Sequence, residues 1–125
     1  MNRLIISIVI LIVMAAGSAL AVMRVNSVTD SLLSQVEKAE DAFMRGAHDE
    51  CVAAADEMNT LWHDFMSTCI LVNDLGHAVE ITSSIVEIGS FAREDNDELY
   101  TACDRAEAQI ALFRDMQTPT LWKIL

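Results

Sequence analysis

The sequence predicts an all-α protein in which an N-terminal transmembrane helix is followed by an antiparallel three-helix bundle with a long central helix. Three observations predict this class: one uncharged apolar run near the start, apolar residues at helical spacing through the rest, and only four glycines and one proline in 125 residues. We therefore divide the chain into a membrane anchor over residues 1–24 and an acidic helical domain over residues 25–125.

The anchor is predicted from the run LIISIVILIVMAAGSALAVM, residues 4–23, which contains no charged residue. About 20 apolar residues at a rise of 1.5 Å each match a hydrocarbon core of about 30 Å. The alternative is a cleavable signal peptide, with Arg3 before the apolar stretch and an A-x-A site at residues 19–21. We favour the anchor, because the run stays apolar to Met23 and ends at Arg24.

Basic residues near the anchor indicate its orientation. Arg3 and the amino terminus favour an N-terminus inside the cell, whereas Arg24 and Lys38 on the other side weaken this bias. We expect a single-pass protein of the cell membrane, with the bulk of the chain outside the cytoplasm.

The domain after the anchor is acidic. The chain has 19 acidic and 8 basic residues, a formal net charge of −11, and every acidic residue follows Arg24. Such a surface repels phosphate backbones, so we expect no nucleic-acid partner. We interpret the acidity as a solvated surface that keeps the domain soluble, in preference to an acidic docking face.

The cysteines do not suggest a zinc or redox site. Cys51, Cys69 and Cys103 are odd in number and widely separated, without a C-x-x-C pair. Each occupies an apolar position of a helical pattern, so we expect buried free thiols.

The first bundle helix is predicted from Val25 to Arg45. Its apolar residues recur at alternating steps of three and four, which places them on one face. The members of this stripe are Val25, Val28, Leu32, Val36, Ala39 and Phe43. We expect Gly46 to follow the helix in a left-handed conformation and a new helix to begin near His48 or Asp49.

The second helix is predicted to run from Asp49 to Ala92. Apolar residues repeat every seven positions, and no proline interrupts them. The repeat consists of Met58, Phe65, Val72, Val79 and Val86. A helix of this length measures about 65 Å and would pack one helix against each half, with Gly76 as the expected kink. We expect Trp62 and Phe65 to lie where the first and second helices face each other.

A polar turn at residues 93–100 precedes the third helix. Asn96 or Asp95 is expected to cap it. Its predicted buried stripe consists of Leu99, Cys103, Ala106, Ile110 and Phe113. The helix should end by Gln117, because Pro119 lacks the backbone N–H that continuation requires.

The C-terminal segment TLWKIL is apolar for a chain end. Large exposed apolar patches are rare on soluble domains. We therefore expect Leu121, Trp122 and Ile124 to fold back onto the bundle.

Asp74, His77 and Glu80 interrupt an apolar stretch at intervals of three residues, which places them on one face of a helix. There they could hold a metal, transfer a proton or bond only to one another. A metal site needs three or four supported ligands, and another helix could contribute Glu107 or Asp104. We favour mutual hydrogen bonding and predict no metal; within this stretch the candidate ligands are Asp74, His77 and Glu80.

Catalytic motifs are missing from the sequence. It contains no G-x-S-x-G elbow, glycine-rich phosphate loop, H-E-x-x-H pair or cysteine beside a histidine partner. We therefore predict a non-enzyme with no catalytic residues and no cofactor.

The order of features resembles a known family. A short anchor, an amphipathic helix, a helix carrying "LWHDF" and "GHAVEI", a polar turn and an ending "WKIL" are similar to the domain of unknown function 4363 family of small bacterial membrane proteins. The similarity covers nearly the whole chain, and its motifs are Trp62, His77 followed by Glu80, and the apolar ending. The resemblance implies a single-pass helical protein with no established activity.

Two classes of function are consistent with these predictions. The first is an accessory or scaffold protein that binds another membrane protein, and the second is a helical domain that senses a small ligand or cation. Very few residues precede the apolar run, so a sensor would have to signal through a partner. This favours the accessory function, with the bilayer and a membrane protein as partners. The sequence leaves open whether the chain forms homo-oligomers.

Overall fold

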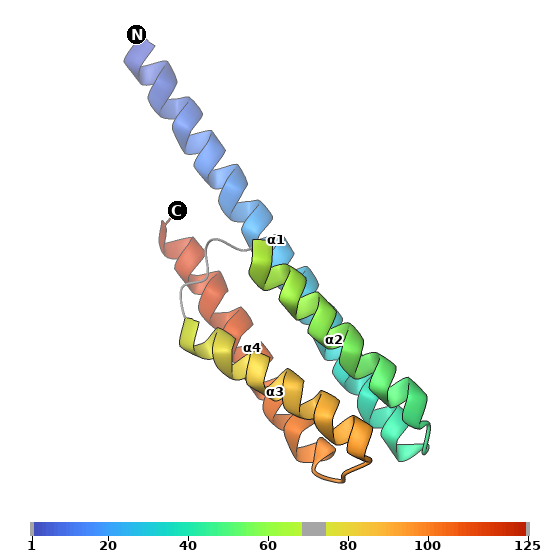
Figure 1. Ribbon diagram of the computed structural model, residues 1–125. Coiled ribbons are helices and arrows are strands. Elements are labelled where there is room, and N and C mark those ends of the chain that lie inside the picture. Colours follow the sequence, from blue (N-terminus) through green and yellow to red (C-terminus); the bar gives the residue numbers. More distant parts are fainter. Residues whose placement is uncertain (1, 69–74, 125) are drawn as a thin grey trace.

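The computed structural model describes the backbone of residues 2–68 and 75–124 and the side chains of residues 2–67 and 76–116. These ranges form four helices, α1 (Asn2–Met44), α2 (His48–Thr68), α3 (Leu75–Glu94) and α4 (Leu99–Ile124), and contain no strand (Figure 1). The predicted all-α class, with a long apolar N-terminal helix followed by helices that pack on one another, is confirmed.

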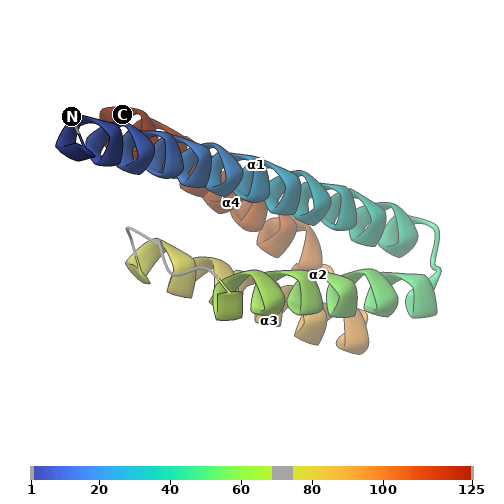
Figure 2. The same ribbon diagram turned by 90° about the horizontal axis from the view of Figure 1, so that it is seen from above.

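The helices form a ring in which each packs mainly against two others. Helix α1 packs against α2 and α4, and α3 packs against the same two helices. Successive helices run in opposite directions, as Figures 1 and 2 both show. Hydrogen bonds between α2 and α3 agree with this arrangement. Trp62 of α2 is bonded to Thr82 of α3, whereas the earlier residue Asp56 is bonded to the later residue Arg93. The two helices are therefore antiparallel.

The prediction of one long central helix is wrong. Helix α2 ends at Thr68, α3 begins at Leu75, and the two pack side by side, which gives a bundle of four helices in place of three. Residues 69–74, including Val72 of the predicted repeat, lie outside the described part of the chain. Gly76, the expected kink, lies in the first turn of α3.

A change of buried face explains the error. In α2 the seven-residue repeat is buried at Met58 and Phe65, as predicted. In α3 the same repeat falls on Val79 and Val86, whose side chains are 65% and 58% exposed. The buried face of α3 is formed instead by Ala78, Ile81, Ser84, Ile85, Ile88 and Ala92. One continuous helix cannot bury both faces against the same neighbours, so the chain reverses direction between them.

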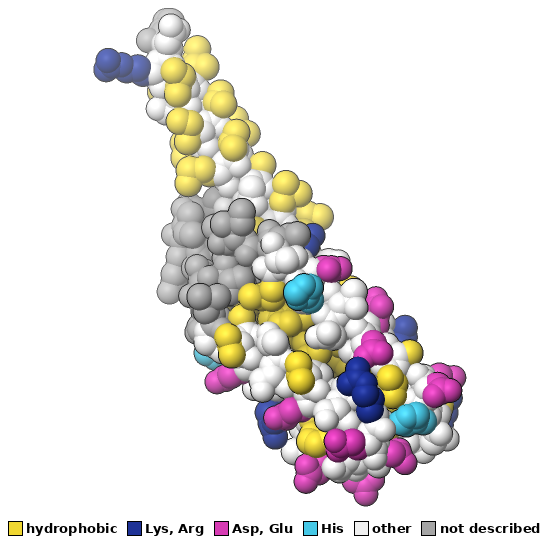
Figure 3. Space-filling view, viewed as in Figure 1, with side chains coloured by type: hydrophobic (Ala, Val, Ile, Leu, Met, Phe, Trp, Pro, Cys, Tyr) yellow, Lys and Arg dark blue, Asp and Glu magenta, His cyan; other side chains and the backbone are white. Residues whose placement is uncertain are grey.

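Helix α1 is a single helix of 43 residues, about 65 Å long, whose two halves differ in burial. Its first half is long and apolar enough to cross a membrane. The large apolar side chains from Leu4 to Met14 are 49–67% exposed and cover the part of α1 that projects beyond the bundle (Figure 3). The first buried residue of α1 is Val25, and the stripe predicted from there is buried or packed against the core.

The two turns at the end of the bundle far from the apolar segment have the same hydrogen-bond pattern. Gly46 follows α1 with φ of 73°, and the N–H of Ala47 donates to the carbonyl of Ala42 at 2.8 Å. Asp95 follows α3 with φ of 55°, and the N–H of Asn96 donates to Phe91 at 3.0 Å. Both are Schellman caps, which require a left-handed residue after the helix. The prediction for Gly46 is confirmed.

Asn96 also begins α4, as predicted. Its side-chain Oδ1 accepts a hydrogen bond from the backbone N–H of Glu98 at 2.9 Å. The same residue therefore completes one helix and caps the next, which allows a tight turn between α3 and α4.

The prediction that the last helix ends by Gln117 is wrong. Helix α4 continues through Pro119 to Ile124. The fixed φ of proline is itself helical, but Pro119 removes the hydrogen bond to the carbonyl of Asp115 and its ring crowds that carbonyl, which together cost about 3 kcal/mol. Asp115 is exposed, and water can replace that bond. The side chains of Leu121, Trp122 and Ile124, predicted to fold back onto the bundle, lie outside those described.

An aromatic cluster fills the core near the apolar half of α1. Phe65 and Trp62 of α2 lie with ring centroids 5.5 Å apart, and Phe113 of α4 lies edge-on to both. The guanidinium of Arg24 lies 5.9 Å from the centroid of the Phe65 ring. The aromatic pair is buried as predicted, but it faces α4 as well as α1, and the Trp62 Nε1 donates to Thr82 of α3.

The aromatic cluster gives a first prediction. Phe65→Ala should lower the free energy of unfolding by about 3 to 5 kcal/mol, because truncation leaves a cavity lined by Trp62 and Phe113. Val86→Ala, on the exposed face of α3, should change it by less than about 0.5 kcal/mol. Unfolding of the full chain in mild detergent, followed by circular dichroism, measures both values. Equal losses would show that Phe65 is not a core residue.

The matched turns give a second prediction with opposite signs at the two sites. Asp95→Gly should stabilise the protein by up to about 1 kcal/mol, because glycine adopts the left-handed conformation without strain. Gly46→Ala should destabilise it by about 1 to 2 kcal/mol through the backbone alone, since an added Cβ would meet no atom within 4 Å. Thermal unfolding of the two variants measures both changes. Shifts of the same sign would refute equivalent caps.

Candidate functional site

Two members of the predicted trio lie near the start of α3, where His77 is half-buried and Glu80 is exposed. Asp74 lies outside the described residues, so the structure gives no geometry for the three together. Within residues 2–67 and 76–116, no three His, Cys, Asp or Glu side chains are placed to share a metal ion. Neither Glu107 nor Asp104, the possible additional ligands, completes such a set.

Glu107 and Asp104 belong to a different group, an acidic cluster between α1 and α4. We define this cluster as Glu37 and Glu40 of α1 with Asp104 and Glu107 of α4. Each helix contributes two carboxyl groups three residues apart, and the antiparallel pairing of α1 and α4 brings the pairs together. The sequence shows both spacings, but it does not show that these two helices are neighbours.

Glu40 is the most constrained member of the acidic cluster. Its side chain is half-buried, and its Oε1 is fully buried with no hydrogen-bond partner. Burial raises the pKa of Glu40, and the negative charges of Glu107 and Asp104 raise it further, while a hydrogen bond with Cys103 opposes the shift. The pKa of Glu107 is also raised, by burial and by Asp104 and Glu37. Both carboxyl groups therefore hold a proton to higher pH than an ordinary glutamate does.

Two buried thiols adjoin the acidic cluster. Cys51 of α2 and Cys103 of α4 are free and buried, as predicted, while Cys69 lies outside the described residues. Burial raises the pKa of both thiols, and the charge of Glu40 adds to the effect on Cys103. Raised pKa values lower the population of the thiolate, which is the nucleophilic form, in both residues.

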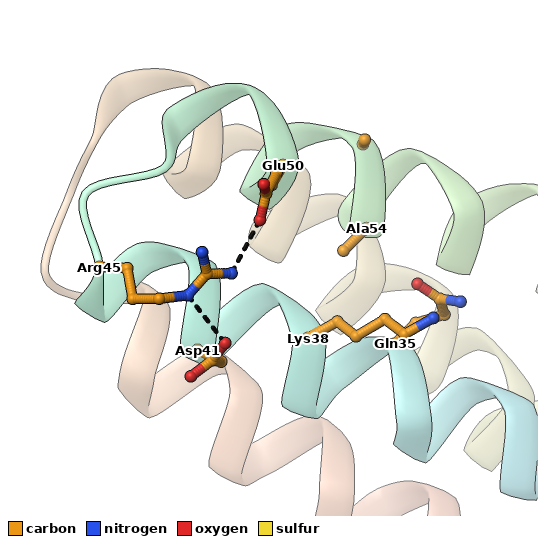
Figure 4. Close-up of a pocket in the computed structure, with 7 residues that line it drawn as sticks. Gln35, Lys38, Asp41, Arg45, Glu50 and Ala54 are labelled. Carbon is orange, nitrogen blue, oxygen red and sulfur yellow. Dashed lines mark hydrogen bonds and ion pairs between the residues drawn. The ribbon is translucent and has the colours of Figure 1, made fainter.

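A second candidate is an open groove of about 300 Å³ between α1 and α2 near their connecting turn (Figure 4). Arg45 spans it, with its Nε 3.0 Å from Asp41 and its Nη2 2.7 Å from Glu50. Lys38 and Gln35 complete the polar lining. The described residues that line the groove include no serine, cysteine or histidine, and exposed ion pairs of this kind contribute little to stability. The groove has the character of a surface turn held by one arginine.

Thr29 is a structural residue that the sequence analysis missed. It is buried in the stripe of α1, and its Oγ1 donates to the carbonyl of Val25 at 2.8 Å. The same hydroxyl accepts from the Nε of Arg114, whose Nη2 lies 2.7 Å from Asp30. Arg114 therefore binds α4 to α1 through two adjacent residues. The only signal in the sequence was a threonine beside the apolar stripe, between Val28 and Leu32.

No protein-family model, no curated protein and no solved structure matches this chain.

The acidic cluster predicts how stability depends on pH. A carboxyl group with a raised pKa in the folded state binds more protons folded than unfolded, so its contribution to stability falls as pH rises through that pKa. Glu40→Gln removes the buried charge and keeps the shape. The variant should therefore unfold at a higher temperature than the parent at pH 7, and this difference should shrink toward pH 4.

Glu57→Gln is the matched control, because Glu57 is an exposed residue of α2 outside the cluster. Its thermal midpoint should stay close to that of the parent at each pH. If Glu40→Gln is less stable than the parent at pH 7, the ionised carboxylate is favourable in the folded state and the assigned direction is wrong.

Proposed function

We propose that this protein is a membrane-anchored accessory or scaffold protein whose helical bundle binds another membrane protein. The observation that carries the proposal is the uninterrupted course of α1 from an exposed apolar segment into the buried stripe of the bundle. A helix is stiff over this length, so the bundle is joined to the apolar segment without a flexible linker. This connection holds the bundle close to the membrane surface, where it can contact a second membrane protein.

The anchor is proposed to remain attached to the bundle. The possible cleavage site at residues 19–21 lies inside α1, whose helical backbone continues on both sides of it. The bulk of the chain is placed outside the cytoplasm, on the basis of Arg3 before the span. The order of anchor, helices, polar turn and apolar ending also supports the proposed relation to the domain of unknown function 4363 family.

The outer face of α3 is the proposed contact surface. Val79 and Val86 lie two turns apart on this face and are among the few large apolar residues exposed outside α1. Ser83 lies between them and is also exposed. A small residue between two valines permits close approach of another helix, whereas most exposed residues of α2 are charged or polar.

A second candidate function is cation sensing at the acidic cluster. The observation that favours it is the buried, unpartnered Oε1 of Glu40 among three further carboxyl groups. Since the described residues offer no metal-binding set, the cation would be a proton. The pH series on Glu40→Gln tests this function as well.

The accessory function is tested by affinity purification of the full chain from mild detergent, with quantitative identification of retained proteins. The parent should retain a specific integral membrane protein, and Val79→Glu with Val86→Glu should lose most of it. These positions are exposed, so the double variant should still fold. Intact mass of the purified chain shows in the same experiment whether residues 1–24 are still present.

Leu112→Glu is the matched control, because Leu112 is an apolar residue of α4 that is 46% exposed. It should retain the partner. Equal retention by all three proteins would reject the α3 surface, and retention of no membrane protein by the parent would reject the accessory function.

A further inference from the structure

The end of α4 lies beside the point where α1 leaves the bundle. Figures 1 and 2 both show the C-terminal end of α4 at the same end of the molecule as the apolar segment of α1. Helix α4 continues to Ile124 and packs against α1.

Contacts between side chains define the register of α4 along α1. Phe43 packs against Tyr100 with ring centroids 5.1 Å apart, and Arg114 bonds to Thr29 and Asp30. From Arg114, ten further helical residues advance about 15 Å, the same distance that separates Thr29 from residue 19 of α1. Residues 120–124 therefore lie level with the last turn of the apolar run, which ends at Met23.

The burial of α1 side chains independently supports the placement of the end of α4 beside the last turn of the apolar run. Ser18, Ala21 and Val22 are half-buried, whereas Ala19, Leu20 and Met23 are exposed. The half-buried residues share one face with Val25, so the packed face of α1 continues back to Ser18. The bundle thus overlaps the end of the apolar run by more than one turn.

The composition of this part of α4 suits a membrane interface. After Asp115, which is the last acidic residue of the chain, the sequence is MQTPTLWKIL. Lys123 carries its only charged side chain. Tryptophan is enriched at the headgroup level of membranes, and lysine extends its amine to the headgroups while its methylene groups remain in apolar surroundings.

We propose that the C-terminal turn of α4, residues 120–124, inserts into the headgroup region of the bilayer and forms a second membrane contact beside α1. The inference rests on the proposed anchoring of α1 in the membrane. It replaces the expectation that this segment folds back onto the bundle, because α4 continues as a helix in the direction of the apolar segment. Two contacts fix the tilt of the bundle, which one helix alone would leave free to vary.

The two tryptophans of the chain provide a direct test. Trp62 is 2% exposed within the bundle, and Trp122 lies in the proposed interfacial turn. The full chain is reconstituted in phosphatidylcholine vesicles whose lipids carry bromine near the headgroup end of the acyl chain, and in matched vesicles without bromine. Bromine quenches only tryptophans close to it, so the parent should lose fluorescence in the brominated vesicles.

Trp122→Phe separates the two signals. This variant keeps an apolar ring but should lose most of the bromine-dependent quenching, because only Trp62 remains. If the parent floats with the vesicles and both proteins are quenched equally, the C-terminal turn is not in the interface and the inference is overturned. If the parent does not float with the vesicles, the anchoring of α1 itself fails.

Discussion

Helix α1 consists of two different halves along one backbone, and the other three helices are arranged around its second half. From Leu4 to Met23 it carries no charged side chain, and Ser7 and Ser18 are its only polar ones, whereas from Val25 onward only one stripe is apolar and the other faces are polar. The first pattern is typical of a helix that faces lipid, and the second of a helix in a water-exposed bundle. Because the helical hydrogen bonds continue through the boundary, the position of the stripe on α1 determines where α2 and α4 stand relative to the apolar segment.

Polar contacts fix the register between neighbouring helices, which the apolar core alone would not determine. Arg114 holds α4 to Thr29 and Asp30 of α1, the Trp62 indole holds α2 to Thr82 of α3, and Ser84 of α3 bonds to Gln109 of α4. Leucine, isoleucine and alanine pack in several registers at similar cost, but a hydrogen bond with a buried partner is satisfied in only one. Thr29 and Ser84, the two buried polar residues among those described, both take part in such contacts.

The sequence predicted the helical class, the end of α1, the start of α2 and, among the described residues, every buried residue of α4 except Ala102, because each depends on local periodicity or on a cap such as Gly46 and Asn96. It failed where two local patterns had to be compared through space. The seven-residue spacing of Met58 and Phe65 continues to Val79 and Val86, but α3 buries a different face. Which face of α3 is buried depends on its packing against α2 and α4, and this packing cannot be read from the spacing. Pro119 misled for another reason: proline disfavours a helix but does not exclude one where solvent can satisfy the carbonyl it leaves unpaired.

The acidic cluster and the level of the C-terminal turn follow from one register between α1 and α4. The pairing that sets Phe43 beside Tyr100 and Arg114 beside Asp30 also sets Glu40 beside Cys103, and it brings residues 120–124 to the end of the apolar run. A shift of α4 by one turn would move it by about 5.4 Å, separate Arg114 from both partners and leave the Thr29 hydroxyl without its donor. The cost of crowding carboxyl groups around Glu40 is thus tied to the contacts that hold α4 at this level. The acidic cluster is compatible with a stable fold because the aromatic core and the Arg114 contacts stabilise the same register.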